Sequence, residues 1–188
     1  MAFSDADLIA RVLADDDRNA FAELVRRHQS AVRGFLRKLS GGDHGRADDL
    51  AQETFLRAYR GLSQFSGEAR FSAWLFGIAY RAFLSELRAR KEAALPASAE
   101  ASRAEGSMAE EPLAERVARR HDLTRAMGQL RPEERAALAL TYGQDISHEE
   151  AAAILDWPLG TLKTHVARAK EHLRRCLLDY EGEVRPST

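Results

Sequence analysis

The chain has only one cysteine, Cys176, among its 188 residues. A single thiol excludes an intramolecular disulfide framework and fits a reducing compartment. Long apolar runs are also missing, since none approaches the roughly 20 residues that a membrane helix needs. The acidic start MAFSDADLIARVLADDD has no apolar core of the kind that a secretory signal peptide carries. We therefore expect a cytoplasmic protein that does not insert into a membrane.

Residue clusters that support catalysis are absent as well. The six histidines are scattered along the chain, and Gly41-Gly42 is not followed by the lysine of a phosphate-binding loop. His148-Glu149 resembles the start of a HExxH metalloprotease motif, but Ala152 stands where the second histidine ligand belongs. The sequence therefore predicts no catalytic residue, no metal site and no cofactor, and an enzyme is kept only as a rival interpretation.

Signals for β-strands are nearly missing too, because the chain has no Asn-Gly or Asp-Gly pair while Ala, Leu, Arg and Glu dominate. Helix signals are strong. Ser4 and Asp7 have the pattern of a capping box before a short helix, and a long amphipathic helix follows up to a stop at Gly41-Gly42. A third helix is expected at about 46–62 and a fourth at about 72–92. Ser72 is the expected N-cap of the fourth helix. The expected buried stripe of the third helix is Ala51, Phe55, Ala58, Tyr59 and Leu62.

Composition changes between residues 94 and 112, ALPASAEASRAEGSMAEEP, where large apolar side chains almost disappear. Such a segment cannot bury enough surface to offset the entropy that ordering costs. Helical patterning resumes at Leu113, and Pro132 and Gly143 mark the start and stop of a later helix. The sequence therefore predicts an all-α protein with two small helical domains joined by a flexible linker. The expected parts are an N-terminal domain at 1–92, the linker at 93–112, a C-terminal helix-turn-helix domain at 113–180 and a tail at 181–188.

The stretch 147-SHEEAAAILDWPLGTLKTHVARAKEHLRR-175 has the pattern of a helix-turn-helix. Ser147 and Glu150 form a capping box, and Pro158 ends the first helix and biases Trp157 toward an extended backbone. Residues 160–175 carry five cations against one carboxylate, a local charge of +4 in a chain of net charge -1. Charge concentrated in this way fits phosphate contact beside base-edge reading, although a solvated helix face is the ordinary alternative.

Two segments carry a resemblance to a known family. They are 48-DDLAQETFLRAYRGLSQFSGEARFSAWLFGIAYRAFLSELRARK-91 and 130-LRPEERAALALTYGQDISHEEAAAILDWPLGTLKTHVARAKEHLR-174. The first has the pattern D-L-x-Q-E-x-F-L-x-A-(W/Y)-R followed by F-x-x-W-L-x-x-I-A. The second carries P-x-G-T-(V/L)-K-(S/T) at the turn of the helix-turn-helix. In order and spacing, the chain resembles a sigma-70-type RNA polymerase sigma factor of the extracytoplasmic-function (ECF) class.

The resemblance implies a bacterial alternative sigma factor that binds core RNA polymerase, melts the minus-10 promoter element and reads the minus-35 element. It also implies contact with the clamp helices of the largest polymerase subunit, with the flap of the second-largest subunit and with an anti-sigma factor. The residues implied to bind polymerase are Asp48, Asp49, Gln52, Glu53 and Arg57. Those implied at the minus-10 element are Phe65, Ser66, Arg70, Phe71, Trp74, Arg81 and Arg88, and those at the minus-35 element are Thr161, Lys163, Thr164, His165 and Arg168.

Elementary physics makes these roles reasonable. Unstacking a base costs a few kcal/mol, so a protein pocket can trap an unpaired base without fuel. Stacking on an aromatic side chain contributes roughly 1–3 kcal/mol per base. The ordinary alternatives are core packing for a tryptophan on a helix and favourable charge at a helix N-terminus for the acidic residues. The aromatic candidates for stacking are Phe65, Phe71, Trp74 and Tyr80.

Three positions depart from the family pattern. Arg81 and Ser85 stand where asparagine and aspartate are common, which puts the minus-10 preference in doubt. His165 stands where arginine is common, which does the same for the minus-35 sequence. We hypothesise that His165 makes a neutral or partly protonated contact, so that minus-35 affinity weakens from about pH 6 to about pH 8.

Two alternatives of other classes remain open. One is a helix-turn-helix transcriptional regulator that binds duplex DNA independently of sigma function, as a dimer. The other is a helical protein that only contacts other proteins, such as an inhibitor of transcription. For the sigma interpretation we expect a monomeric chain in isolation. Whether promoter binding needs core polymerase distinguishes these hypotheses.

Overall fold

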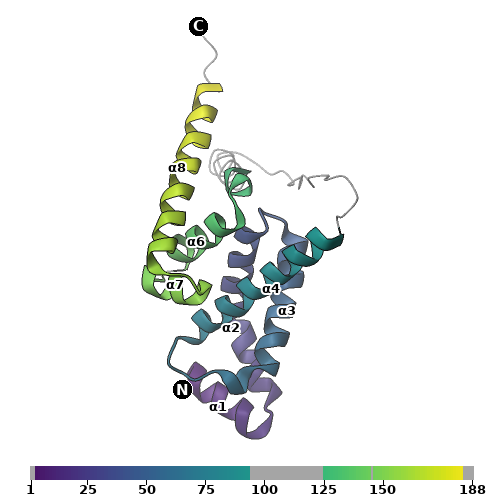
Figure 1. Cartoon of the computed structure of the whole chain (residues 1–188). Coiled ribbons are helices and arrows are strands. Elements are labelled where there is room, and N and C mark those ends of the chain that lie inside the picture. Colours follow the sequence, from purple (N-terminus) through teal and green to yellow (C-terminus); the bar gives the residue numbers. More distant parts are fainter. Residues whose placement is uncertain (1–2, 94–124, 145, 184–188) are drawn as a thin grey trace, which may run out of the picture. The chain divides into compact units, whose positions relative to one another are not determined.

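The computed structural model describes residues 3–93, 125–144 and 146–183, and every regular element among them is helical (Figure 1). The all-α prediction is therefore confirmed. The chain divides into two compact units. The first holds α1, α3, α4 and most of α2, and the second holds α6, α7 and α8, with residues 37–44 grouped to it. Apart from residues 93 and 181–183, the predicted linker and tail lie outside the described residues.

Two caps define the start of the first unit, where α1 runs from Asp5 to Asp15 and α2 from Arg18 to Leu39. The capping box expected at Ser4 is present: the Asp7 amide donates to Ser4 Oγ (3.2 Å), and the Ser4 amide donates to Asp7 Oδ2 (2.8 Å). After α1, the Asp17 side chain accepts hydrogen bonds from the amides of residues 19 and 20. These bonds satisfy helix-end amides that would otherwise lack partners.

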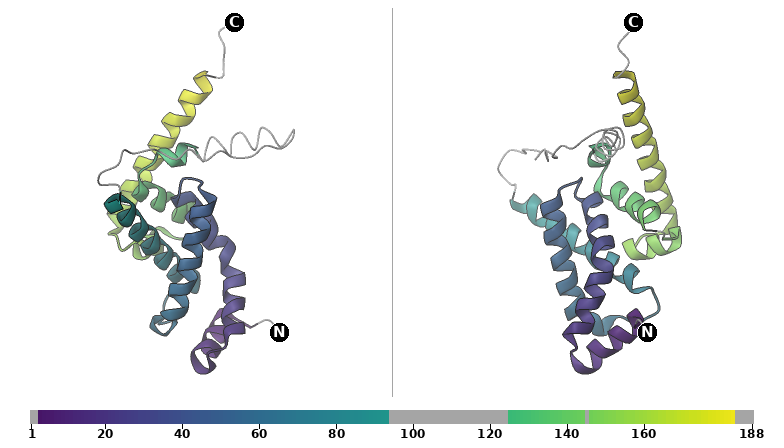
Figure 2. Two further views of the ribbon diagram at one scale, coloured as in Figure 1. Left: turned by 90° about the vertical axis from the view of Figure 1, so that its right-hand side faces the viewer. Right: turned by 180° about the vertical axis from the view of Figure 1, so that it is seen from behind.

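The rest of the first unit consists of α3 (His44–Arg60), the 3₁₀ turn η1 (Leu62–Gln64) and α4 (Phe71–Ala93). Gly41 and Gly42 end α2 as expected, with φ of 67° and 94° that glycine adopts without strain. Figure 2 shows α4 running obliquely across α2 and α3. The core of the unit is filled by Leu24, Phe35, Leu36, Ala51, Ala58, Leu75 and Phe83.

Two expectations for this unit need correction. The Trp74 amide donates to the Arg70 carbonyl oxygen (3.2 Å), so α4 begins at Phe71 and Ser72 lies inside its first turn rather than at the N-cap. The stripe predicted on α3 is buried except at Tyr59, which is half-buried. The Tyr59 hydroxyl donates to Asp16, so this side chain joins α3 to the end of α1.

The second unit is built from α6 (Pro132–Gly143), α7 (His148–Leu155) and α8 (Leu159–Glu183), which pack on one another. Pro132 starts α6 and the helix stops at Gly143, as predicted. Its core is formed by Leu130, Ala136, Leu140, Ile146, Ala151, Leu155, Leu162, Val166 and Ala169. Of the helices that the structure describes, none has the length and apolar character needed to cross a membrane.

Candidate nucleic-acid and protein interfaces

An aromatic cluster lies where η1, the following loop and α4 meet. The ring centroids of Phe65, Phe71 and Trp74 are 5.4–5.6 Å apart in all three pairs. Phe71 is only 5% exposed, whereas Phe65 and Trp74 are half-buried. The cluster therefore keeps two rings partly accessible and supports them with a third ring beneath.

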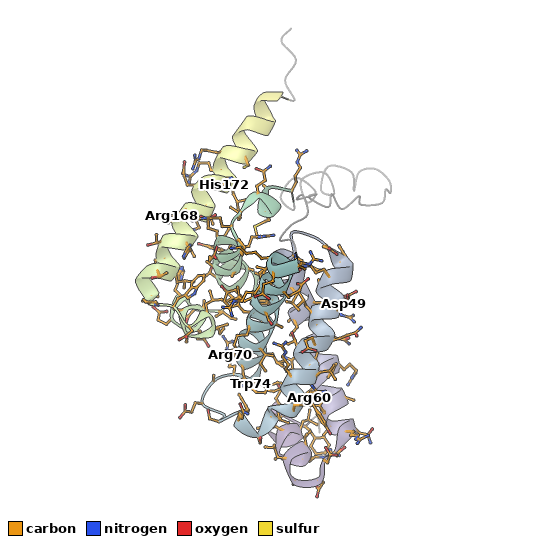
Figure 3. The ribbon with its side chains drawn as sticks, turned by 45° about the vertical axis from the view of Figure 1, so that its right-hand side comes forward. Asp49, Arg60, Arg70, Trp74, Arg168 and His172 are labelled. Atoms are coloured by element: carbon orange, nitrogen blue, oxygen red, sulfur yellow. The ribbon has the colours of Figure 1, made fainter. Side chains whose placement is uncertain are left out.

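The loop beside this cluster, residues 66–70, is exposed. Its turn uses Gly67, with φ of 79°, and the Ser66 hydroxyl, which accepts a hydrogen bond from the Glu68 amide (3.4 Å). Figure 3 shows Arg70 and Trp74 beside this loop, at the start of α4. The predicted minus-10 residues at 65–74 are thus brought together in one place.

One face of α4 continues from the cluster. Arg81, Ser85 and Arg88 are exposed, and they follow Trp74 at steps of seven, four and three residues, so that they share its face of the helix. Tyr80 is not part of this face. Tyr80 is 4% exposed and Phe71 is 5% exposed, so the expectation that these two rings offer stacking surface is wrong.

The outer surface of α3 carries the residues expected to bind polymerase. The exposed ones are Asp49, Gln52 and Arg57, and the half-buried ones are Asp48 and Glu53. Glu53 pairs with Arg57 on the same helix (2.7 Å), and Asp48 lies 3.3 Å from Arg33 of α2. Asp49 has no ion pair within the described part of the chain. It is labelled in Figure 3, toward the opposite end of α3 from Arg60.

Leu56 belongs to the same surface, and the sequence prediction missed it. Its residue is 52% exposed, and it lies four residues after Gln52 and four before Arg60, which places the three on one face. The signal was available, because Leu56 falls outside the predicted buried stripe of α3. A single exposed leucine is ordinary on a protein surface, so Leu56 adds an apolar side chain to this polar face without by itself marking a docking site.

The turn between α7 and α8 follows the predicted motif. The Glu150 amide donates to Ser147 Oγ and the Ser147 amide to Glu150 Oε2, both at 3.1 Å, so the capping box is confirmed. Asp156 then adopts a left-handed φ of 57° and ends α7. Aspartate is one of the few residues besides glycine that tolerate this conformation. With only Trp157 and Pro158 in between, α8 begins at Leu159 without a longer loop.

The predicted minus-35 residues lie on the outer side of α8. The exposed ones are Thr161, Lys163, Thr164 and Arg168, and His165 is half-buried. Thr164 Oγ1 donates to the Gly160 carbonyl oxygen (2.9 Å), which leaves its lone pairs to accept. The His165 ring lies 4.9 Å from the Trp157 ring, and its Nδ1 atom is buried with no hydrogen-bond partner among the described residues. Nε2 is therefore the nitrogen of the His165 ring that can bind a ligand.

The cations of α8 differ in what surrounds them. Arg174 lies 2.6 Å from Glu171, and Arg175 lies 3.8 Å from the same carboxylate. Lys170 Nζ lies 4.5 Å from the centroid of the Tyr142 ring. Lys163 and Arg168 form no ion pair within the ranges that the structure describes. Of the five cations at 160–175, Lys163 and Arg168 are therefore the two for which the structure describes neither an ion pair nor a ring contact.

A surface groove of about 400 Å³ lies between α6 and α8. It is lined by Arg168 and His172, both labelled in Figure 3, and by the carboxylates of Glu134 and Glu171. Burial raises the pKa of Glu134, but hydrogen bonds from Arg131 lower it, and the net pKa is below the ordinary value. The structure brings no three metal-ligating side chains together in the residues it describes.

Comparison with known proteins identifies the family. The model of sigma-70 region 2 matches residues 24–93, and that of sigma-70 region 4 matches residues 120–173. The RNA polymerase sigma-H factor of Pseudomonas aeruginosa is 31% identical over 182 residues, which cover 92% of this chain and 93% of that protein. The chain belongs to the ECF class of sigma-70 factors. Every predicted polymerase and minus-10 residue of this ECF factor lies in the region 2 match, and every predicted minus-35 residue lies in the region 4 match.

A further relative and two solved structures are similar to the chain over most of its length. ECF RNA polymerase sigma factor SigE of Mycolicibacterium smegmatis is 34% identical over 169 residues, 88% of this ECF factor but only 64% of that protein. The sigma factor RpoE of Bartonella quintana, solved with the anti-sigma factor NepR, aligns with a TM-score of 0.67 at 27% identity, covering 84% of this chain and 96% of that one. CnrH, solved with the cytosolic domain of CnrY, aligns with a TM-score of 0.66 at 28% identity, covering 94% and 97%.

Proposed function

We propose that this ECF factor binds core RNA polymerase in the cytoplasm and directs it to specific promoters, where it melts the minus-10 element and reads the minus-35 element. The observation that carries the proposal is the presence in one chain of an exposed polar surface on α3, a partly accessible aromatic cluster and a helix-turn-helix with exposed cations on α8. A regulator that binds duplex DNA alone needs only the last of these features.

Polymerase docking is assigned to α3. Asp49 and Gln52 offer a carboxylate and an amide to cationic and polar partners, and Leu56 offers an apolar side chain between them and Arg60. Full burial of a leucine side chain contributes roughly 1.5–3 kcal/mol. Leu56 is therefore the anchor of the proposed docking surface, and the charged residues around it orient the partner. The proposed partners are the clamp helices of the largest subunit.

Promoter opening is assigned to the aromatic cluster and the α4 face that continues from it. Phe65 and Trp74 are accessible enough to stack on an unpaired base, while Phe71 supports them from the buried side. Arg81 and Arg88 lie further along the same face, where they can track the phosphates of the displaced strand. Trapping one base in this way offsets the cost of unstacking it.

Minus-35 reading is assigned to the N-terminal half of α8. Lys163 and Arg168 are suited to phosphate contact because neither is held by a carboxylate of the described chain. Thr164 and His165, which lie between them in the sequence, offer an acceptor oxygen and Nε2, the kinds of group that read base edges in a major groove. The flap of the second-largest subunit is the proposed polymerase partner of this unit.

An anti-sigma factor is the further partner that we propose. Both aligned structures were solved in complexes, the sigma factor RpoE with the anti-sigma factor NepR and CnrH with the cytosolic domain of CnrY. A protein that covers the docking surface of α3 would block polymerase binding without touching DNA. We expect the free chain to be a monomer.

The test is promoter-specific run-off transcription with purified core polymerase. Promoters are first chosen by sequencing the transcripts that overproduction of the chain induces. We expect a specific transcript only when core enzyme and this chain are both present, and weak promoter binding by the chain alone. Tight binding to the same promoters without core enzyme, with no specific transcript when it is added, would instead support an independent helix-turn-helix regulator.

A further inference from the structure

The aromatic cluster has a neighbouring ring, that of His28, which belongs to neither the loop nor α4. The ring of His28, on α2, meets Phe71 edge to face, with 5.3 Å between ring centroids and an interplanar angle of 73°. The His28 side chain is only 16% exposed. Phe71 in turn contacts both Phe65 and Trp74. His28 is therefore connected to the two accessible rings through one intermediate residue, Phe71.

The first residue of α1 holds His28 in place. Asp5 Oδ2 lies 2.7 Å from His28 Nε2, and Asp5 Oδ1 lies 3.0 Å from the Arg27 guanidinium. An ionised carboxylate only accepts hydrogen bonds, so the bond requires a proton on Nε2 of His28. The imidazole ring is thus fixed between a carboxylate at one side and a phenyl ring at another.

We infer that Asp5 and His28 are positioning residues for promoter opening, with α1 acting through them on the aromatic cluster. The inference rests on the proposed function of that cluster. With His28 fixed, Phe71 keeps its edge-to-face partner on α2, and Phe65 and Trp74 are held in the arrangement that receives a base. Without the His28 ring, Phe71 can relax toward α2, and Phe65 and Trp74 lose the ring that supports them both.

This contact is separate from the forces that attach α1 to the unit. Leu8, Ile9 and Val12 of α1 are buried, and Arg11 forms its own ion pair with Asp17 at 2.6 Å. Loss of the Asp5–His28 contact therefore leaves the apolar attachment of α1 intact. The Arg11–Asp17 pair provides a matched control, because it starts on the same helix and does not contact the aromatic cluster.

The experiment measures open-complex formation by the holoenzyme, as permanganate reactivity of unpaired thymines in the minus-10 element. His28→Ala and Asp5→Ala are expected to lower the open fraction about three- to tenfold, the range that loss of an edge-to-face ring contact implies. Core-polymerase affinity and thermal midpoint should stay close to those of the parent chain. His28→Phe keeps a ring against Phe71 and should recover most of the loss, and Arg11→Gln should have no effect.

Two further measurements decide the interpretation. On a template already unpaired at the minus-10 element, the defect of His28→Ala should shrink, because base capture no longer limits the reaction. In a Trp74→Ala background, His28→Ala should add little. An equal defect in Arg11→Gln, full additivity with Trp74→Ala, or normal opening by both Asp5→Ala and His28→Ala would overturn the inference. Failure of the proposed function would look different, since the parent chain itself would then give no promoter-specific transcript.

Discussion

The aromatic cluster near Trp74 and the outer face of α8 present candidate DNA-contacting side chains in different ways. In the cluster, each ring touches the other two. On α8, Lys163 and Arg168 are exposed and five residues apart, and neither is tied to a described carboxylate. A surface of touching rings should behave as one cooperative unit, whereas separate cations on a helix should act independently. Base capture requires a shaped site, and phosphate contact requires only charge at a suitable place.

Trp74→Ala is the strongest way to break the cluster. We expect open-complex formation to fall roughly five- to hundredfold, because a base stacked on an aromatic ring contributes about 1–3 kcal/mol. Permanganate footprinting of the holoenzyme measures the change. Phe65→Ala with Trp74→Ala should cost less than the product of the single changes. Simple multiplicativity would contradict the picture of a cooperative cluster.

Leu56→Ala should reduce both minus-10 opening and minus-35 binding, because in the proposed function both require that the chain first bind polymerase. We expect about a tenfold loss of core affinity, at the lower end of the roughly 1.5–3 kcal/mol that a buried leucine contributes. Competition binding with labelled core polymerase measures it. Leu13→Ala is the matched control, because Leu13 is 50% exposed on α1 and lies outside the proposed surface. Equal losses in the two variants would argue against docking through α3.

Lys163→Ala tests whether the cations of α8 contribute independently to DNA binding. Promoter binding by the holoenzyme should weaken a few-fold at every promoter, and the slope of log affinity against log salt should flatten by about one unit. Arg168→Ala should add to this effect in full. Lys170→Ala is the control, because Lys170 lies over the Tyr142 ring, and its removal should change the slope less. Altered base preference at an unchanged slope would exclude a phosphate role for Lys163.

The smallest expected effect concerns His165. If the contact is partly protonated, minus-35 affinity should weaken from about pH 6 to about pH 8, because histidine is the side chain that ordinarily changes charge in this range. Fluorescence anisotropy of the holoenzyme on minus-35 DNA follows the change, and His165→Gln should give a flat profile. A flat profile in the parent chain, or one shared with the Gln variant, would leave the neutral ring as the contacting form.

Local chemistry alone determined the helices and their ends. Ser4 and Ser147 cap helices, Gly41-Gly42 stops one and Pro158 separates two, because each acts through its own backbone or its near neighbours. The sequence pattern also indicated the family, which the comparisons confirmed. One local prediction failed at Ser72, because the helix already begins at Phe71, where the Arg70 carbonyl oxygen accepts a hydrogen bond from the Trp74 amide.

Tertiary structure decided which of the motif residues are available. Tyr80, Phe71 and Trp74 read alike as aromatic candidates, yet Tyr80 and Phe71 are buried, whereas Trp74 is half-buried and keeps an accessible ring. Leu56 is exposed although it is apolar, and Lys170 is drawn to Tyr142 although it belongs to a basic helix. The contact of Asp5 with His28 joins residues 23 apart in the chain. Such outcomes depend on how several helices pack against one another. The sequence pattern of a single helix does not predict that packing.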